Sequence, residues 1–318
     1  MFSNNKNKLT AEAVLGALAT VQEPELHRDL VSLNMIQDLR VEGGKVKFTL
    51  VLTTPACPLK DVMKRDIDAA LARVPGFESL EIKWDAKVRS DGRNRGLIQM
   101  PIKNAVAIAS GKGGVGKTTV AVNIAVALAR SGAAVGLLDA DIYGPNVPMM
   151  MGVAHMPPPR NDKMIPAEAY GVRFMSIAFL VKPEQPLIWR GPMLHSAIRQ
   201  FLEDVAWGEL DYLIIDLPPG TGDAQLSLCQ SLPLTGGVIV TLPQAVSQAD
   251  ARRGLEMFRQ LQVPVLGVVE NMSYLVLPDG TEMDVFGRGG GEQLARAAGV
   301  PFIGAIPMEA EVRKGSDS

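Results

Sequence analysis

One glycine-rich stretch, SGKGGVGKTT at residues 110–119, limits more than any other what this chain can fold into. The apolar run AVAIAS precedes it and the helical pattern TTVAVNIAVALAR follows, so the glycines form a loop between a strand and a helix. The pattern G-x-x-x-x-G-K-[ST] of a phosphate-binding loop is satisfied by Gly111, Gly116, Lys117 and Thr118. Glycines there let backbone N–H groups approach phosphate oxygens, and the N-terminus of the following helix adds positive potential. The stretch therefore predicts a nucleotide-binding α/β domain.

The residues of this loop have separate expected roles. We expect the Lys117 ammonium to hold the β- and γ-phosphates and the Thr118 hydroxyl to ligate Mg²⁺. The backbone around the phosphates is expected to come from Gly111, Gly113, Gly114, Val115, Gly116 and Thr119. A glycine-rich turn without a ligand is the alternative, and the flanking strand and helix argue against it.

Short apolar runs alternate with helical patterns throughout the second part of the chain. They read AVAIAS, AAVGLLD, GVRFMSI, DYLIID, GGVIVTL, PVLGVVE and PFIGAI. Strands that are apolar without alternation are buried on both faces, which is typical of a parallel sheet covered by helices. The fold class expected from this pattern is α/β, with a mostly parallel, doubly wound P-loop NTPase sheet.

A smaller block precedes this sheet. Thr10 is expected to cap a helix over AEAVLGALATV. The segments IQDLRV and KVKFTLVLTT are expected to form a hairpin around EGGK. A helix in KDVMKRDIDAALARV and a strand in FESLEIKWD are expected to follow. We therefore expect a small α+β domain over residues 1–89, a linker over 90–104 and an ATPase domain over 105–318. Because EVRKGSDS ends the sequence soon after PFIGAI with no closing helix, a truncated C-terminus is expected.

Charge and composition argue against several classes of protein. Lys+Arg 32 against Asp+Glu 34 gives a net charge of −2 without a long run of one sign, which disfavours binding to nucleic acid or to a membrane surface. No apolar stretch approaches the ~18 residues of a membrane span. The N-terminus MFSNNKNKLT shows no secretory signal, and the two cysteines form no disulfide framework. We expect a cytoplasmic protein.

Aspartates follow two of the predicted strands. Asp139 and Asp141 lie in GLLDADIYGPN, and Asp216 ends the strand in YLIIDLPPGTGD. In an open parallel sheet these positions lie at the edge where the phosphate loop lies. Asp216 suits a second-sphere magnesium carboxylate, and the loop after it, with Gly220 and Gly222, suits a switch that senses the γ-phosphate. Each aspartate alone could face water at a strand end, but their order behind a phosphate loop favours a nucleotide site.

A second lysine, Lys112, lies where the phosphate-loop pattern accepts any residue. An isolated lysine of this kind is ordinarily a solvated loop residue. The segment K-G-G-V-G-K-T resembles, however, the deviant phosphate loop of the MinD/ParA/nitrogenase-iron-protein superclass. The resemblance implies a homodimer in which Lys112 reaches the nucleotide of the partner subunit and stabilises charge on the transferring phosphoryl group. Catalysis would then use Lys112 and Lys117.

The same resemblance assigns further residues of the nucleotide site. It implies that Asp141 orients the attacking water and that Asp139 supports the magnesium region. Asn271, after PVLGVVE, matches the asparagine of the family that hydrogen-bonds the base, which favours ATP as the nucleotide. Asp250 matches a position near the early lysine.

The resemblance becomes narrower in five segments of the second block. DADIYGPNVPMMMG, PLIWRGPMLHSAIRQFL, DYLIIDLPPGTGD, VVENMSY and FGRGGGEQLA resemble the Mrp/ApbC family of iron–sulfur cluster carrier ATPases, over about residues 104 to 314. The first block, through TTPACPLKD, resembles a PaaD-like iron–sulfur-assembly domain. The resemblance implies an ATP-gated homodimer that binds clusters and transfers them to apoproteins, with apoproteins or assembly proteins as partners.

The sequence departs from that family at the cluster site itself. Members that hold a cluster carry C-x-x-C shortly after NMSY, whereas this chain has Leu277 and Gly280 in that neighbourhood. A [4Fe–4S] cluster ordinarily takes about four thiolates. Cys229, in QLSLCQSL, is interpreted as a packed core residue. Cys57 precedes a helix, whose N-terminus would stabilise a thiolate, and is either a cluster ligand or transfer thiol or a structural turn residue.

Other functions stay open at this point. The chain could be an ATPase scaffold in cluster assembly that holds no cluster of its own. It could be a MinD/ParA-like positioning ATPase, although neither a basic amphipathic C-terminal helix nor a basic patch is evident. It could also be a nucleotide-gated binding module without useful turnover. A nitrogenase-type electron donor is disfavoured, because DLPPGTGDAQLSL holds no cysteine before Cys229.

Overall fold

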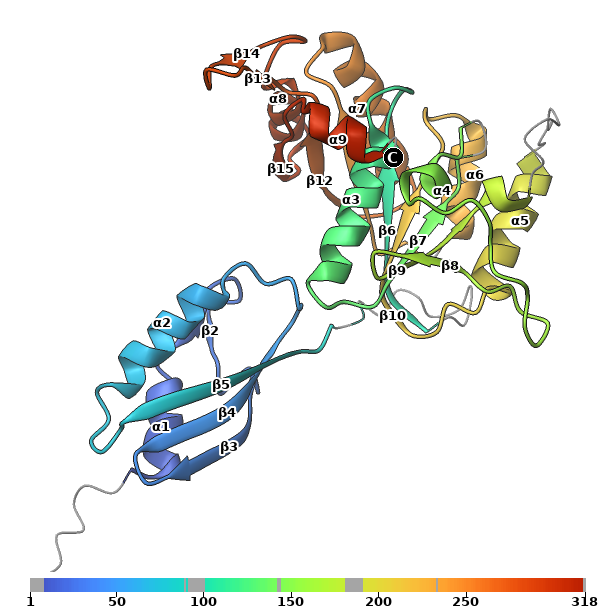
Figure 1. Cartoon of the computed structure of the whole chain (residues 1–318). Helices are drawn as coiled ribbons and strands as arrows, with labels where there is room; N and C mark the ends of the chain where they lie inside the picture. Colours follow the sequence, from blue (N-terminus) through green and yellow to red (C-terminus); the bar gives the residue numbers. More distant parts are fainter. Residues whose placement is uncertain are drawn as a thin grey trace, which may run out of the picture. The chain divides into compact units, whose positions relative to one another are not determined.

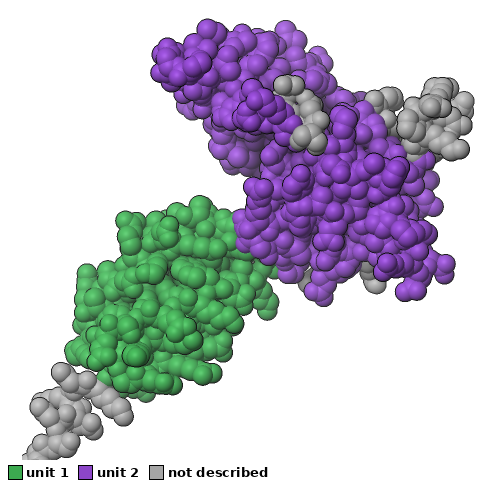
Figure 2. All heavy atoms as spheres, in the orientation of Figure 1, with its two compact units in different colours: residues 1–89 green, residues 90–318 purple. Residues whose placement is uncertain are grey.

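The structure is a computed structural model that describes residues 9–88, 90, 101–141, 144–180, 191–232 and 234–316. It divides into two compact units, residues 1–89 and 90–318, which are coloured separately in Figure 2. Most of the linker expected over residues 90–104 falls on 91–100, which lie outside the described residues. Its last residues correct the expected boundary, because 102–104 form the start of a strand in the second unit.

The first unit is a three-stranded sheet packed against two helices (Figure 1). The strand order is β3-β4-β5, with β3 antiparallel and β5 parallel to β4. The elements are α1 (Ala11–Leu18), β1 (Gln22–Glu23), β2 (Arg28–Asp29), β3 (Ile36–Glu42), β4 (Lys45–Leu52), α2 (Lys60–Leu71) and β5 (Ser79–Ala86). Alternate residues of β4 are buried against both helices, so the expected α+β unit is confirmed.

Two local signals in this unit act as the sequence predicts. The Thr10 hydroxyl accepts a hydrogen bond from the backbone N–H of Ala13 at 3.2 Å and so caps α1. The turn between β3 and β4 needs its two glycines: Gly43 has φ +63°, and a Cβ on Gly44 would lie 2.8 Å from the carbonyl oxygen of Gly76. The predicted cap and hairpin are therefore confirmed.

The second unit is built on an eight-stranded sheet with the order β15-β12-β11-β6-β10-β7-β9-β8. Its strands are β6 (Ile102–Ala109), β7 (Val135–Asp139), β8 (Ala167–Ala169), β9 (Val172–Ser176), β10 (Leu210–Asp216), β11 (Gly236–Thr241), β12 (Val265–Glu270) and β15 (Phe302–Ala305). Every pairing is parallel except that of the edge strand β8 with β9.

Helices cover both faces of this sheet (Figure 1). They are α3 (Lys117–Arg130), α4 (Val147–Met150), η2 (Ile177–Leu180), α5 (Gly191–Glu203), α6 (Asp223–Ser231), α7 (Ala245–Gln260), α8 (Gly290–Ala298) and α9 (Ala310–Ser316). One buried cluster joins the sheet to α5, α6, α7 and α8, and the other joins it to α3 and α4. Strands β7 and β11 are buried along their whole length. The expected doubly wound, mostly parallel α/β fold is therefore confirmed.

Two features of this unit differ from the expectation. The antiparallel edge strand β8 has three residues and was not predicted. The expectation that no helix follows PFIGAI was wrong, because α9 begins at Ala310 and carries Glu311 in its first turn, where a carboxylate favours a helix N-terminus. Within the described residues, none of the helices combines the length and the apolar character needed to cross a bilayer.

A short hairpin, β13 (Leu275–Val276) and β14 (Glu282–Met283), projects from the unit after β12. Its base is closed by the carboxylate of Glu270, which is fully buried. That carboxylate accepts hydrogen bonds from the Ser273 hydroxyl and from the backbone N–H groups of Gly289 and Gly291 at the start of α8. Both ends of the segment 274–288 are thus tied to one side chain, which also serves as the anionic partner of the α8 N-terminus.

Candidate nucleotide-binding site

The glycine-rich loop lies at the carboxyl edge of the parallel sheet, between β6 and α3. Gly114 and Gly116 have φ values of +76° and +79°, in the left-handed region that favours glycine. A Cβ on Gly116 would lie 2.2 Å from Nδ2 of Asn271, and one on Gly111 would lie 2.1 Å from the carbonyl carbon of Asp250. Two of the pattern glycines are therefore required by close packing as well as by any approach of a phosphate.

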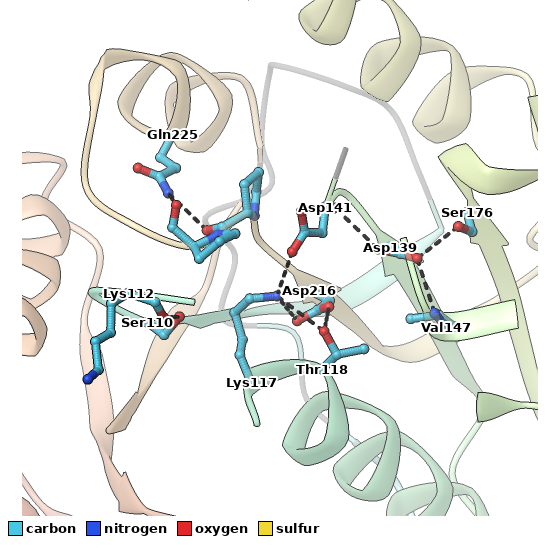
Figure 3. Close-up of polar contacts among 12 residues, drawn as sticks. Ser110, Lys112, Lys117, Thr118, Asp139, Asp141, Val147, Ser176, Asp216 and Gln225 are labelled. Carbon is cyan, nitrogen blue, oxygen red and sulfur yellow. Dashed lines mark hydrogen bonds and ion pairs between the residues drawn. The ribbon is translucent and has the colours of Figure 1, made fainter. Parts of the chain in front are cut away.

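Lys117 and Thr118 converge on Asp216, the last residue of β10 (Figure 3). Nζ of Lys117 lies 2.7 Å from Oδ1 of Asp216 and 3.6 Å from Oδ2 of Asp141. The Thr118 hydroxyl donates to Oδ2 of Asp216 at 2.6 Å. Burial raises the pKa of Asp216, and the neighbouring Lys117 ammonium opposes that rise. The four residues form one network of two buried carboxylates, a buried ammonium and the hydroxyl of the half-buried Thr118.

Asp139 belongs to a neighbouring group of contacts, which is joined to the first through the backbone of Asp141. Its carboxylate accepts hydrogen bonds from Oγ of Ser176 at 2.8 Å and from the backbone N–H groups of Asp141 at 3.2 Å and Val147 at 3.3 Å. Burial, and next to it the charge of Asp216, raise the pKa of Asp139 to about 7. These contacts fix the backbone of Asp141 and the start of α4. The magnesium role expected for Asp139 stays a prediction.

A cavity of about 350 Å³ opens above the loop. It is lined by Ser110, Lys112, Gly113, Gly114, Gly116, Lys117, Thr118, Thr119, Asp141, Gly144, Asn146, Met150 and Pro219. Most of the loop residues that the sequence assigns to phosphate binding, together with Asp141, thus surround one space. The lining in the described chain does not include four other predicted residues, Gly111, Val115, Asp139 and Asp216.

A larger cavity of about 790 Å³ adjoins the first and shares Thr119, Asn146 and Met150 with it. Its remaining lining is mostly apolar and comes from α3, α4, the segments after β12 and β15, and α9. Asn271 lines it, and Nδ2 of Asn271 donates to the carbonyl oxygen of Val115 at 2.8 Å. The sequence analysis did not predict this cavity, because part of its wall comes from α9, a helix that was not expected. The only sequence signal for that helix was its first turn, in IPMEAEV.

Lys112 contributes its backbone to the loop, while its side chain points away from Lys117 (Figure 3). Its carbonyl oxygen accepts a hydrogen bond from Oγ of Ser110 at 2.9 Å. Its half-buried side chain forms no hydrogen bond or ion pair with any other described residue. The carboxylate of Asp250, whose backbone adjoins Gly111, pairs instead with Arg253 at 3.0 Å.

The donors present fit a triphosphate and a divalent cation. A Cβ on Gly114 would meet no atom within 4 Å, so the backbone of the loop faces open space there. The Thr118 hydroxyl gives its proton to Asp216, which leaves oxygen lone pairs for a cation. The Lys117 ammonium is 5% exposed and lines the cavity, so it offers an anion a nearly dry positive charge.

The two cysteines differ in their surroundings. Cys229 is buried in the second unit, where burial raises its pKa to about 12, so its interpretation as a packed core thiol is confirmed. Cys57 is half-buried, lies just before α2 and packs against the core of the first unit. No group of three or more His, Cys, Asp or Glu side chains that could hold a metal ion occurs among the residues that the structure describes.

Comparisons with known proteins agree over both units. Residues 101–318 match the family described as "NUBPL iron-transfer P-loop NTPase", and residues 11–84 match "Iron-sulfur cluster assembly protein". The iron–sulfur cluster carrier protein of Synechocystis sp. is 54% identical to this chain, over 97% of this chain and 90% of that protein. The iron–sulfur cluster carrier protein of Deinococcus radiodurans is 55% identical, over 96% of this chain and 87% of that protein.

A solved structure supports the same assignment for the second unit. A nucleotide-binding protein from Archaeoglobus fulgidus, solved in complex with ADP, is 40% identical. The similarity covers 68% of this chain and 86% of that chain, with a TM-score of 0.61.

Proposed function

Because this chain belongs to the iron-transfer P-loop NTPases, we propose that it hydrolyses Mg-ATP and couples that cycle to the transfer of an iron–sulfur cluster to apoproteins. The observation that carries the nucleotide part is the network of Lys117, Thr118, Asp141 and Asp216 beside the phosphate loop. The cargo part rests on family membership and on the assembly-type first unit. A cytoplasmic location, and the absence of nucleic-acid and membrane partners, stay predictions from the sequence.

In this proposal each residue of the network has one task. The Lys117 ammonium and the backbone of the loop hold the β- and γ-phosphates. Thr118, with Asp216 behind it, holds Mg²⁺, which when bound neutralises charge on the phosphate oxygens. The Asp141 carboxylate, which lines the cavity, accepts a proton of the attacking water and orients it.

The larger cavity is proposed to receive the nucleoside. Its apolar lining suits a base, and Asn271 is the polar group expected to read it. Nδ2 of Asn271 donates one of its two hydrogens to Val115, so Oδ1 and the second N–H remain for a ligand. An acceptor beside a donor matches the 6-amino group and an adjacent ring nitrogen of adenine, and the resemblance of Asn271 to the base-binding asparagine of the family favours ATP.

The homodimer is proposed from Lys112. Its ammonium has no partner among the described residues of its own chain, although Lys112 lines the phosphate cavity. A second copy placed against this edge would give that charge a phosphate to contact, in the manner of a residue supplied in trans.

The cluster is the cargo in this proposal, and Cys57 is its proposed thiolate contact. The C-x-x-C positions after NMSY hold Leu277 and Gly280, so any protein ligand must come from elsewhere. Cys229 is unsuitable because it is buried with a raised pKa, whereas Cys57 is half-buried beside the N-terminus of α2. The alternative is an ATPase scaffold that binds assembly partners and holds no cluster.

Anaerobic reconstitution with iron and sulfide separates the cluster carrier from the scaffold. If Cys57 is a ligand, the wild type should bind iron and develop visible absorbance, and Cys57→Ala should lose both. Cys229→Ala is the matched control, which should keep the iron because that thiol lies in the core. A wild type without stoichiometric iron would leave only the scaffold, and a Cys57→Ala variant that keeps its cluster would refute the assignment of Cys57.

Asp141→Ala should trap ATP without hydrolysing it. Loss of the group that orients the water is expected to lower the rate of phosphate release by about 10²-fold or more, while ATP stays bound through Lys117. Phosphate release and retained radiolabelled ATP on filters would measure the two effects. Asp204→Ala, which removes an exposed aspartate paired with Lys163 at 3.8 Å, is the control and should hydrolyse ATP at the wild-type rate. Normal turnover in Asp141→Ala would remove this residue from the mechanism.

A further inference from the structure

One buried side chain, Gln225, holds the loop 217–222 that follows Asp216 (Figure 3). Its Nε2 donates to the carbonyl oxygen of Pro218 at 2.9 Å and also to that of Pro219. Its Oε1 accepts from the backbone N–H of Gly222 at 2.6 Å. Gln225 is 5% exposed, so these bonds form almost out of water.

Glutamine is the residue type that this arrangement requires. Gln225 stands at the third position of α6 and reaches back to its N-cap residue Gly222, as a residue of a capping box does. A capping box needs only the acceptor oxygen. The two donor hydrogens of the amide go instead to two successive proline carbonyls, and a glutamate has no donor for them when ionised. The amide is therefore used for the loop and not only for the helix.

The loop that Gln225 holds forms a wall of the phosphate cavity. Pro219 lines that cavity, and a Cβ on Gly113 would lie 3.9 Å from Cγ of Pro219. The backbone N–H of Gly220 donates to the carbonyl oxygen of Ser110 at 2.9 Å, which joins the wall to the first residue of the phosphate loop. A displacement of α6 would thus move Pro219 relative to the bound phosphates.

We infer that Gln225 is a positioning residue, which fixes the loop 217–222 against the phosphate loop so that the cavity wall keeps the geometry that hydrolysis requires. The inference rests on the proposed ATP hydrolysis. The phosphates are held mainly by the Lys117 ammonium and by the phosphate loop, which Gln225 does not touch. Its loss should therefore affect turnover much more than binding, since a misplacement of about 1 Å near reacting groups costs on the order of 10²-fold in rate.

The test replaces Gln225 with methionine, which keeps the length of the side chain and removes all of its hydrogen bonds. In Gln225→Met we expect kcat to fall on the order of 10²-fold, with KM and the Kd for ATP within about threefold of the wild type. Amide hydrogen exchange at Gly220 and Gly222 should rise at least about tenfold. The N–H of Gly222 loses its acceptor on Gln225, and the N–H of Gly220 is no longer held against Ser110. Gln225→Glu keeps the shape and the acceptor of the side chain but loses its donors. It should lower kcat and raise exchange at Gly220, as Gln225→Met does.

The matched control is Gln248→Met. Gln248 also lies near the start of a helix and donates to a proline carbonyl, that of Pro243 at 2.7 Å, but away from the phosphate cavity. It should leave kcat and exchange at Gly220 unchanged. Equal losses of kcat in Gln225→Met and Gln248→Met, or a fall in ATP affinity as large as the fall in kcat/KM, would overturn the inference.

The exchange measurement separates this inference from the proposed function. Unchanged exchange at Gly220 in Gln225→Met overturns the inference, whatever the hydrolysis assay gives. A wild type that binds ATP and never hydrolyses it overturns the proposed function, and the exchange at Gly220 then decides alone whether Gln225 holds the loop.

Discussion

Lys117→Ala is expected to abolish ATP binding and to lower the stability of the second unit at the same time. The ammonium is the positive charge that faces both the phosphate cavity and the buried carboxylate of Asp216, at 2.7 Å. Removing one partner of a buried ion pair leaves the other charge uncompensated and costs about 3–5 kcal/mol. For a unit of this size, that corresponds to a fall in Tm on the order of 10 °C.

The two effects of Lys117 can be measured apart. Equilibrium dialysis with ATP should show a loss of affinity of about 10²-fold or more, and a thermal melt should show the loss of stability. Adding Asp216→Asn to Lys117→Ala removes the uncompensated carboxylate, so the melt should recover while ATP binding stays lost. Lys163→Ala, at an exposed lysine, is the control and should change neither. Normal ATP affinity in Lys117→Ala would refute the assigned phosphate site.

Lys112→Ala is expected to show the opposite combination. Its side chain has no partner among the described residues, so its loss should leave Tm unchanged and ATP binding measurable. If the ammonium acts on the nucleotide of a second copy, dimer-dependent hydrolysis should fall by about 10³-fold or more, as for an arginine finger. The measurement is phosphate release per chain against protein concentration, which should rise with concentration in the wild type and stay flat in Lys112→Ala.

Mixing two inactive variants tests the action in trans directly. In a heterodimer of Lys112→Ala with Asp141→Ala, one site combines an intact Asp141 with Lys112 from the other chain. Random pairing makes half of the dimers mixed with one competent site each, so roughly a quarter of the wild-type rate should return. No recovery from a mixture that forms heterodimers would show that Lys112 does not act across the interface. A wild type that stays monomeric with ATP, and hydrolyses it as fast after dilution, would contradict the homodimer.

The sequence predicted most of the architecture of the second unit, because a buried parallel strand leaves an uninterrupted apolar run. All seven predicted strands pair in one sheet, with the phosphate loop at the end of β6. The resemblance to iron–sulfur cluster carrier ATPases is confirmed by the family match and by relatives 54% and 55% identical. The strand β8 was missed, since three residues that pair only at an edge carry no periodic signal.

The contacts within the site were less accessible to sequence reasoning. The hydrogen bonds that Asp139 accepts from Ser176 and from the backbone of Val147 form only when β7 pairs with β9. No local sequence pattern indicates that pairing. The contacts of Gln225 were also missed, although a glutamine three residues after Gly222 matches a capping box. That pattern predicts the bond to Gly222 but not the two proline carbonyls, because these depend on how the loop folds back over the helix.

The closure of the β13–β14 hairpin by Glu270 bears on how such a chain could come to lack the expected cysteine pair. The hydrogen bonds of the Glu270 carboxylate go to Ser273, Gly289 and Gly291 at the root of the projection, and none involves Leu277 or Gly280 near its tip. We therefore expect substitutions at the tip to leave the sheet of the P-loop NTPase unit undisturbed. The tip of this segment and the nucleotide site are therefore free to evolve at different rates.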